Sequence, residues 1–148
     1  MSDYSVLWLD NDPGNIGALG MSLRQAGMDV TVVTKVGAAE DLVRRGHFDL
    51  VLVDVMIPVT DDEVNSGYAA DHTEYSLLTG LVFYIRNRQY LAKSVVVVLT
   101  VRIDGETREK FVAAGLPPEN FMTRYEVRDS RKFTAEMLRR LRAAASSQ

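Results

Sequence analysis

The stretch Phe48-Asp49-Leu50-Val51-Leu52-Val53-Asp54-Val55-Met56-Ile57-Pro58 is the most informative part of this sequence. It contains a short apolar run that ends abruptly at a carboxylate, with a proline four positions later. A near-continuous apolar run of this length is typical of a strand buried on both faces, as in a parallel sheet. Open α/β sheets bind their ligands at the carboxyl edge of the strands. Asp54, just past the end of this strand, is therefore the first candidate for chemistry.

The composition is that of a globular protein. The 148 residues suffice for one domain with a core, and the formal net charge of −3 gives no sign of direct nucleic-acid binding. The chain has no cysteine, which excludes disulfides and thiolate metal sites and fits a reducing compartment. No apolar run approaches the length of a membrane span and no secretory signal is visible. We therefore expect a cytoplasmic protein with no membrane partner.

Strand-like and helix-like segments alternate along the chain. Strands are predicted at 6–9, 29–33, 49–53, 95–99 and 120–123, and helices at 13–26, 38–45, 77–88, 106–114 and 133–141. Asp12 followed by Pro13 is typical of an N-cap with proline at the first helical position. Five strand–helix repeats predict an α/β fold over residues 1–148, a single domain with a parallel five-stranded sheet and helices on both faces.

Polar side chains follow four of these strands. They are Asp10, Asn11, Asp12, Asp54, Thr100 and Arg124. Because parallel strands end at one edge, these side chains should gather there, and gathered carboxylates repel unless a cation joins them. Magnesium takes oxygen ligands, usually one or two carboxylates with waters and phosphate oxygens. A carboxylate can attack phosphorus, while a hydroxyl and a cationic group hold the phosphoryl oxygens. These parts suit phosphoryl transfer onto Asp54.

With these motifs the chain resembles the receiver domain of two-component response regulators. The resemblance runs from Val6 to about Leu141. The segments that carry it are Val6-Leu7-Trp8-Leu9-Asp10-Asn11-Asp12-Pro13, Asp54-Val55-Met56-Ile57-Pro58, Thr79-Gly80-Leu81, Val96-Val97-Val98-Leu99-Thr100 and Phe121-Met122-Thr123-Arg124. It implies a CheY-like, flavodoxin-like (βα)5 fold, a doubly wound sheet with strand order 2-1-3-4-5.

The resemblance also implies roles for individual residues. Asp54 would be the phosphoacceptor, assisted by Thr100 and Arg124, and Thr100 and Phe121 would form the switch. The ligands of a magnesium ion would be Asp10, Asn11, Asp12, Asp54 and the backbone carbonyl of Met56.

The same resemblance implies partners. A histidine kinase or phosphotransfer protein would donate the phosphoryl group, and an effector or a second copy would bind the surface of the fourth helix, fifth strand and fifth helix. The chain would thus be a signalling domain, with no catalysis beyond its own phosphorylation and dephosphorylation.

Several residues depart from the family pattern. Asn11 stands where the family usually has a second acid, which removes one negative charge and should weaken magnesium binding. Asp12 either compensates for that loss or caps the following helix. Arg124 replaces the family's lysine, and either holds a phosphoryl group or pairs with a nearby carboxylate. Phe121 suits a switch role or a plain core position.

A long insertion follows the phosphoacceptor strand, at about residues 59–79. Pro58 and Gly80 lie 22 positions apart (80 − 58), far more than the family usually has. A long loop in a compact domain is often functional. The segment is polar, so we expect it to govern access or partner choice and to add little to the core, with Tyr68 and Tyr75 as exceptions. Its acidic run 61–63 is interpreted as a solvated loop.

Three other functions compete with a phosphorylated receiver. A pseudo-receiver would share the fold and bind partners without phosphorylation. A phosphohydrolase of the haloacid dehalogenase type would use Asp10 and Asp12, but Gly14 occupies the place of its expected threonine and Asp54 is left unexplained. A flavodoxin-like cofactor binder would need a phosphate-cradling loop after the first strand, where acidic residues stand instead.

Overall fold

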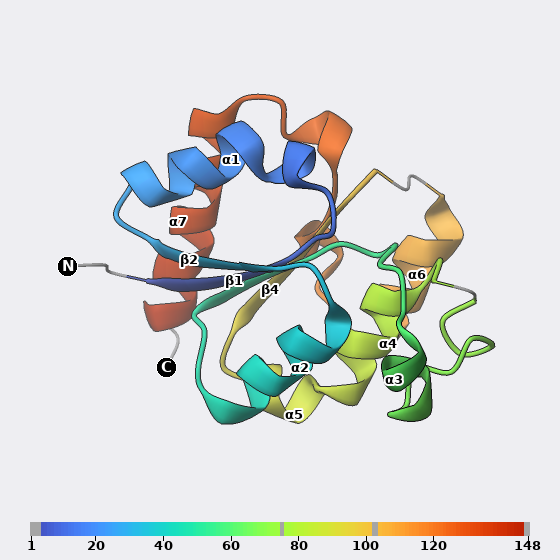
Figure 1. Ribbon diagram of the computed structural model, residues 1–148. Helices are drawn as coiled ribbons and strands as arrows, with labels where there is room; N and C mark the ends of the chain where they lie inside the picture. The colour runs from blue at the N-terminus through green and yellow to red at the C-terminus, as the bar shows by residue number, and fades with distance from the viewer. Residues whose placement is uncertain (1–3, 75, 102–103, 147–148) are drawn as a thin grey trace.

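The computed structural model describes residues 4–74, 76–101 and 104–146. Its strands are β1 (Ser5–Leu9), β2 (Asp29–Val33), β3 (Leu50–Val53), β4 (Val95–Thr100) and β5 (Phe121–Thr123). They form one five-stranded sheet in the order β2-β1-β3-β4-β5, and every neighbouring pair is parallel (Figure 1). The predicted α/β fold and its strand order are confirmed.

Helices connect the strands and cover both faces of the sheet. They are α1 (Pro13–Gln25), α2 (Val36–Arg45), α3 (Asp61–Asn65), α4 (Thr79–Arg86), α5 (Arg88–Leu91), α6 (Gly105–Ala113) and α7 (Ser130–Ser146), with short 3₁₀ turns η1 (Pro118–Asn120) and η2 (Arg124–Glu126). The helix predicted at 77–88 is two helices, because the chain leaves helical geometry at Asn87. None of the helices in the described part of the chain is long and apolar enough to cross a bilayer.

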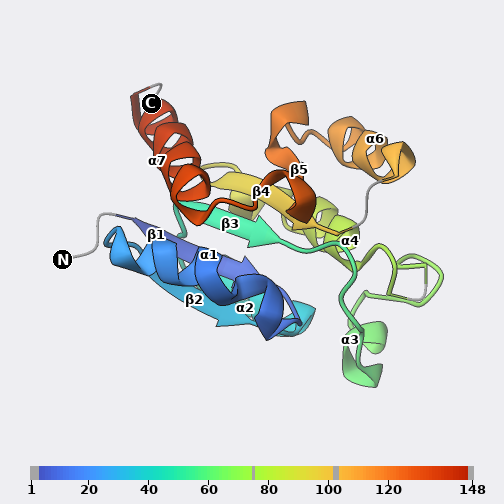
Figure 2. The same ribbon diagram turned by 90° about the horizontal axis from the view of Figure 1, so that it is seen from above.

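Two apolar layers hold the sheet between the helices. Figure 2 views the sheet from the side that α1 and α7 cover. On one side, Trp8 and Leu52 pack with Leu23 of α1 and Met137 of α7. The other side is built by residues from α2, α4, α5 and α6 against the opposite face of the same strands. Side chains alternate between the two layers along each strand, which explains why β3 is apolar at every position.

The start of α1 follows its sequence signal. The Asp12 side chain accepts a hydrogen bond from the Gly14 amide at 2.9 Å, and Pro13 takes the first helical position. The predicted N-cap is therefore confirmed. The helix is interrupted at Gly17, whose φ of 11° and ψ of −114° are not helical.

The insertion is folded back onto the body, beside α4 in Figure 1. Its helix α3 begins with a capping box, in which Thr60 and Glu63 exchange side-chain and backbone hydrogen bonds. The other carboxylate oxygen of Glu63 accepts from the Gly37 amide of α2 at 2.6 Å. Since α2 has no side-chain cap of its own at Lys35, the insertion supplies one.

A buried charge network fixes the middle of the insertion. Glu40 of α2 accepts hydrogen bonds from the Tyr68 hydroxyl, the Arg86 Nε and the Asn87 amide, each at 3.0 Å. The Arg86 guanidinium also lies over the Tyr68 ring, 5.0 Å from its centroid, and donates to the Ser66 carbonyl. Burial alone would raise the pKa of Glu40, but these three hydrogen bonds outweigh it and lower that pKa.

The expectation that the insertion adds little to the core is wrong. Tyr68 is 1% exposed, as foreseen, but Glu63, Thr73 and Leu78 are buried as well. The reason is that polar side chains of this segment find partners on α2 and α4, so their burial needs no apolar periodicity. Tyr75 lies outside the described residues.

Candidate functional site

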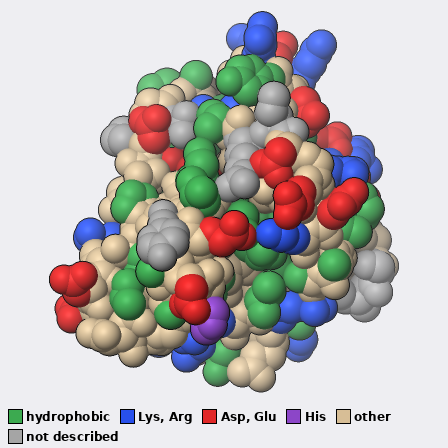
Figure 3. All heavy atoms as spheres, turned by 90° about the vertical axis from the view of Figure 1, so that its right-hand side faces the viewer, with side chains coloured by type: hydrophobic (Ala, Val, Ile, Leu, Met, Phe, Trp, Pro, Cys, Tyr) green, Lys and Arg blue, Asp and Glu red, His purple; other side chains and the backbone are tan. Residues whose placement is uncertain are grey.

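The predicted edge of the sheet brings four of the polar residues together. Asp10 follows β1, Asp54 follows β3, Thr100 ends β4 and Arg124 follows β5. Thr100 hydrogen-bonds to the Asp54 carboxylate, and both Asp10 and Asp54 act electrostatically on Arg124. Figure 3 views the molecule from this side and shows acidic side chains spread over that face.

Asp54 is a buried carboxylate with a raised pKa. It is 6% exposed, and its Oδ1 accepts a hydrogen bond from the following amide, Val55, at 2.8 Å. Burial, and next the charge of Asp10, raise the pKa of Asp54 to about 6, against the opposing hydrogen bonds from Val55, Thr100 and Met56. Perturbed titratable groups of this kind concentrate at functional sites.

The three residues after β1 do not share one role. Asp10 is fully buried, and its Oδ1 accepts from the Asp12 amide at 2.9 Å. Asn11 and Asp12 are exposed. Because one Asp12 oxygen is engaged in capping α1, the structure favours the capping interpretation of this residue over compensation for Asn11.

Arg124 is half-buried at the first position of η2. Burial lowers its pKa, while the charges of Asp10, Asp54 and Asp12 oppose that effect. Its Nη1 is buried and has no hydrogen-bond partner among the described residues. An anion at Asp54 would offer this nitrogen an acceptor.

Phe121 faces the interior. It is 8% exposed, and its ring centroid lies 5.7 Å from that of Phe111 on α6, which in turn lies 6.0 Å from that of Tyr84 on α4. The core position considered for Phe121 is thus observed, and its role as a switch stays a prediction.

A magnesium ion fits this site only through a small set of ligands. No cluster of three or more Asp, Glu, His or Cys side chains that could hold a metal occurs within residues 4–74, 76–101 and 104–146. Two carboxylates whose charges already repel, Asp10 and Asp54, are however the number that magnesium commonly uses, with waters and a carbonyl completing its shell.

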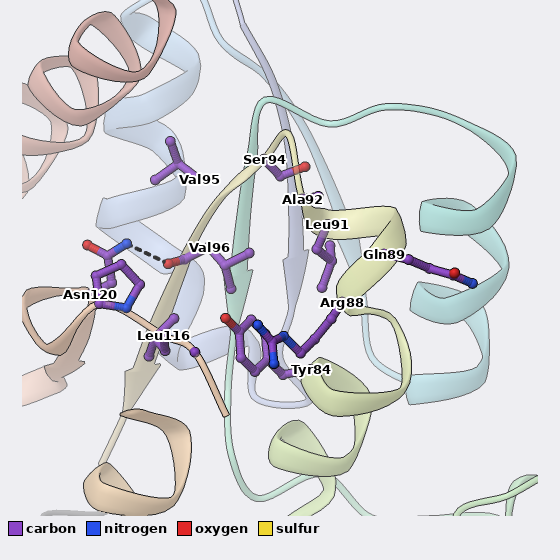
Figure 4. Close-up of a pocket in the computed structure, with 12 residues that line it drawn as sticks. Tyr84, Arg88, Gln89, Leu91, Ala92, Ser94, Val95, Val96, Leu116 and Asn120 are labelled. Carbon is purple, nitrogen blue, oxygen red and sulfur yellow. Dashed lines mark hydrogen bonds between the residues drawn. The ribbon is translucent and has the colours of Figure 1, made fainter. Parts of the chain in front are cut away.

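A groove of about 700 Å³ lies elsewhere, between α4, α5 and the segment before β5, as Figure 4 shows. Its floor includes Val95 and Val96 at the amino end of β4, whereas Thr100 of the site ends the same strand. Arg88 reaches into the groove over the Tyr84 ring, 6.0 Å from its centroid. The groove is therefore separate from the acidic site.

The β3–α4 connection contains a contact that the sequence motif did not reveal. Gly80 donates its amide to the Val55 carbonyl at 2.9 Å, and a Cβ at Gly80 would lie 2.2 Å from the Asp54 carbonyl oxygen. Only glycine fits there, so α4 starts in direct backbone contact with the candidate phosphoacceptor. The charge network around Glu40 was also missed, because its members lie far apart in the sequence.

Comparison with known proteins gives structural but no sequence relatives. No family model and no curated protein matches the sequence. A CheY-like receiver domain protein from Methanospirillum hungatei JF-1 aligns with a TM-score of 0.76 at 14% identity, covering 98% of both chains. The BeF3-activated receiver domain of Klebsiella pneumoniae RstA gives 0.69 at 20%, covering 93% of this chain and 98% of that one. An orphan response regulator of H. pylori gives 0.68 at 17%, with coverages of 95% and 98%. At these identities the likeness establishes the receiver-domain fold.

Proposed function

We propose that this chain is a response-regulator receiver domain that accepts a phosphoryl group on Asp54. One observation carries the proposal: a buried carboxylate whose pKa is raised to about 6 is hydrogen-bonded by Thr100 and lies within the electrostatic reach of Asp10 and Arg124. The receiver-domain fold supports it. In such a domain, a local charge biases a two-state element and thereby a binding surface.

The group that reacts is the ionised carboxylate. At neutral pH, which is above a pKa of about 6, Asp54 is mainly ionised. One of its oxygens bonds to phosphorus while the bond from phosphorus to the donor breaks, and the donor leaves with that electron pair. Magnesium would be held by Asp10, Asp54 and the Met56 carbonyl, and its charge would offset those of the carboxylates and the phosphoryl oxygens.

Two side chains would hold the product. The Thr100 hydroxyl, which bonds the free carboxylate, would turn to a phosphoryl oxygen. The unpartnered Nη1 of Arg124 would donate to another. Phe121 lies in the core on β5, which pairs with the strand that ends at Thr100, so its ring would respond to a shift of Thr100.

A second candidate is a pseudo-receiver that binds its partner without phosphorylation. The observation that favours it is access: Asp54 is only 6% exposed, and Asn11 leaves the site with fewer carboxylates than the family usually has. The two candidates share the fold and differ only in whether Asp54 reacts.

The partners follow from the same proposal. A histidine kinase or phosphotransfer protein would donate to Asp54 in the cytoplasm, and α6, β5 and α7 would bind the effector or a second copy. The fourth and fifth helices predicted from the sequence are α6 and α7. The insertion would contribute to partner choice, since α3 and its neighbours stand on the outside of α2 and α4.

Labelling decides between the candidates. The purified protein is incubated with acetyl phosphate and magnesium, and intact-protein mass spectrometry looks for the mass of one phosphoryl group. Asp54→Asn and a sample without magnesium are the controls. We expect labelling only of the wild-type protein in the presence of magnesium. If Asp54→Asn is labelled as well as the wild type, Asp54 is not the phosphoacceptor. An unlabelled wild type would favour the pseudo-receiver.

A further inference from the structure

We infer that Thr79 is a positioning residue for the Asp54 site. It holds in place the turn whose backbone amides donate hydrogen bonds to the Asp54 carboxylate. The expected effect on phosphorylation rests on the proposed function, whereas the hydrogen bonds that hold the turn do not depend on it. Thr79 is fully buried, and its hydroxyl donates to the Ile57 carbonyl at 2.5 Å. It is the first residue of α4, on the far side of the insertion from Ile57.

The turn in question runs from Asp54 to Pro58. Its first two amides, those of Val55 and Met56, donate to the Asp54 carboxylate. At one end the turn is fixed to the sheet, because the Asp54 amide donates to the Leu9 carbonyl at 2.9 Å. The other end has no strand neighbour, so its position depends on what α4 offers.

Three hydrogen bonds join the second end of the turn to α4 and to the residues just before it. Gly80 N donates to Val55 O at 2.9 Å, Thr79 Oγ1 to Ile57 O at 2.5 Å, and Val59 N to Ser76 Oγ at 3.2 Å. We call these three bonds the neck of the insertion. Ser76 adopts a φ of 76°, a conformation disfavoured for residues other than glycine, in order to join it.

The neck explains how a receiver-type site tolerates a long insertion. Without it, the contacts of the insertion with Gly37 and Glu40 would still hold its middle, but the turn beside Asp54 would lose these ties to α4 and be free to move. With the neck closed, both ends of the 54–58 turn are held. Thr79 supplies the only neck hydrogen bond from a fully buried side chain, since Ser76 is half-buried and the Gly80 bond is made by backbone.

The test compares Thr79→Val, which keeps the shape and removes the donor, with Thr79→Ser, which keeps the donor. Thr134→Val is the matched control, since Thr134 of α7 is a buried threonine, 7% exposed, whose hydroxyl hydrogen-bonds the Ser22 side chain of α1 at 2.6 Å, away from the insertion. Thr79→Ala serves if the valine variant does not fold. Two quantities are measured: amide hydrogen exchange of Val55 and Met56 by NMR, and the rate of phosphoryl labelling as a function of acetyl phosphate concentration.

We expect Thr79→Val to speed exchange at Val55 and Met56 by about tenfold or more, as expected when a local opening no longer has to break a buried hydrogen bond. The maximal labelling rate should fall by about tenfold with little change in the half-saturating donor concentration. Thr79→Ser should restore both quantities, and Thr134→Val should leave both unchanged.

The outcomes separate this inference from the proposed function. Unchanged exchange and labelling in Thr79→Val would overturn the inference while leaving Asp54 as phosphoacceptor. A wild type that is never labelled would remove the proposed function, and the exchange measurement would still decide whether Thr79 positions the turn. Equal losses in Thr79→Val and Thr134→Val would show a general effect on stability and overturn the specific role.

Discussion

Replacing Asp54 with asparagine should make the folded protein more stable at neutral pH. Burial and the charge of Asp10 raise the pKa of Asp54 from 3.8 to about 6, so the folded state at pH 7.5 holds an ionised group that it disfavours. A rise of about two pKa units corresponds to about 3 kcal/mol of free energy of unfolding. Asparagine has nearly the same shape, carries no charge and still offers an oxygen to the Val55 amide.

The sign of the pH dependence follows from proton binding. Because the pKa of Asp54 is higher in the folded than in the unfolded state, the folded state binds more protons between pH 3.8 and about 6. The contribution of Asp54 to the free energy of unfolding is therefore most favourable below this window, where Asp54 is protonated, and becomes less favourable as the pH rises through it. The advantage of Asp54→Asn should be near zero at pH 4 and reach about 3 kcal/mol, as an upper figure, at pH 7.5.

Urea unfolding measures this difference directly. Trp8 is the single tryptophan and is fully buried, so its fluorescence reports the loss of the core. Both proteins are unfolded at pH 4, 6 and 7.5, with Asp71→Asn, a substitution of an exposed aspartate, as the control. An equal advantage at all three pH values, or a less stable Asp54→Asn at pH 7.5, would refute the reasoning.

Three further substitutions test other parts of the structure. Tyr68→Phe removes a hydrogen bond to the buried carboxylate of Glu40 and should cost about 1.5–3 kcal/mol of stability in urea unfolding; a loss below about 0.5 kcal/mol would mean that water or Arg86 replaces it. Gly80→Ala places a Cβ 2.2 Å from a backbone oxygen of Asp54, so a loss of about 1–3 kcal/mol or more is expected, and full stability would contradict the observed backbone contact. Asn11→Asp should tighten magnesium binding in a calorimetric titration, and an equal or weaker affinity would sink the idea that the missing charge matters.

The sequence predicted the sheet well because its signals are local. The apolar run before Asp54 and the similar run before Thr100 both became central strands, buried in every residue from 50 to 53 and from 96 to 100. The N-cap at Asp12 was equally readable. The helix α3 was missed although its capping box, Thr60 with Glu63, stands in the sequence; the acidic residues were interpreted as a solvated loop.

What could not be predicted depends on residues that meet only in the fold. The residues that hydrogen-bond to Glu40 lie far from it in the sequence: Tyr68 is 28 positions away and Arg86 is 46 positions away. Each of the three alone resembles an ordinary surface or core residue. The composition of the insertion suggested a polar loop for the same reason. Likewise, the tight backbone contact beside Asp54 is made by Gly80, which is 26 positions away (80 − 54).

The Glu40 network has a consequence for how this sequence can change over evolutionary time. Losing Tyr68 or Arg86 alone leaves a buried carboxylate short of donors, whereas exchanging the whole group for apolar residues of similar volume is commonly neutral or favourable. Substitutions at these positions should therefore covary. Related chains with a short β3–α4 connection should lack the glutamate and the arginine together, and chains that keep the pair should keep the tyrosine. The insertion and the α2–α4 surface should thus be inherited as one unit.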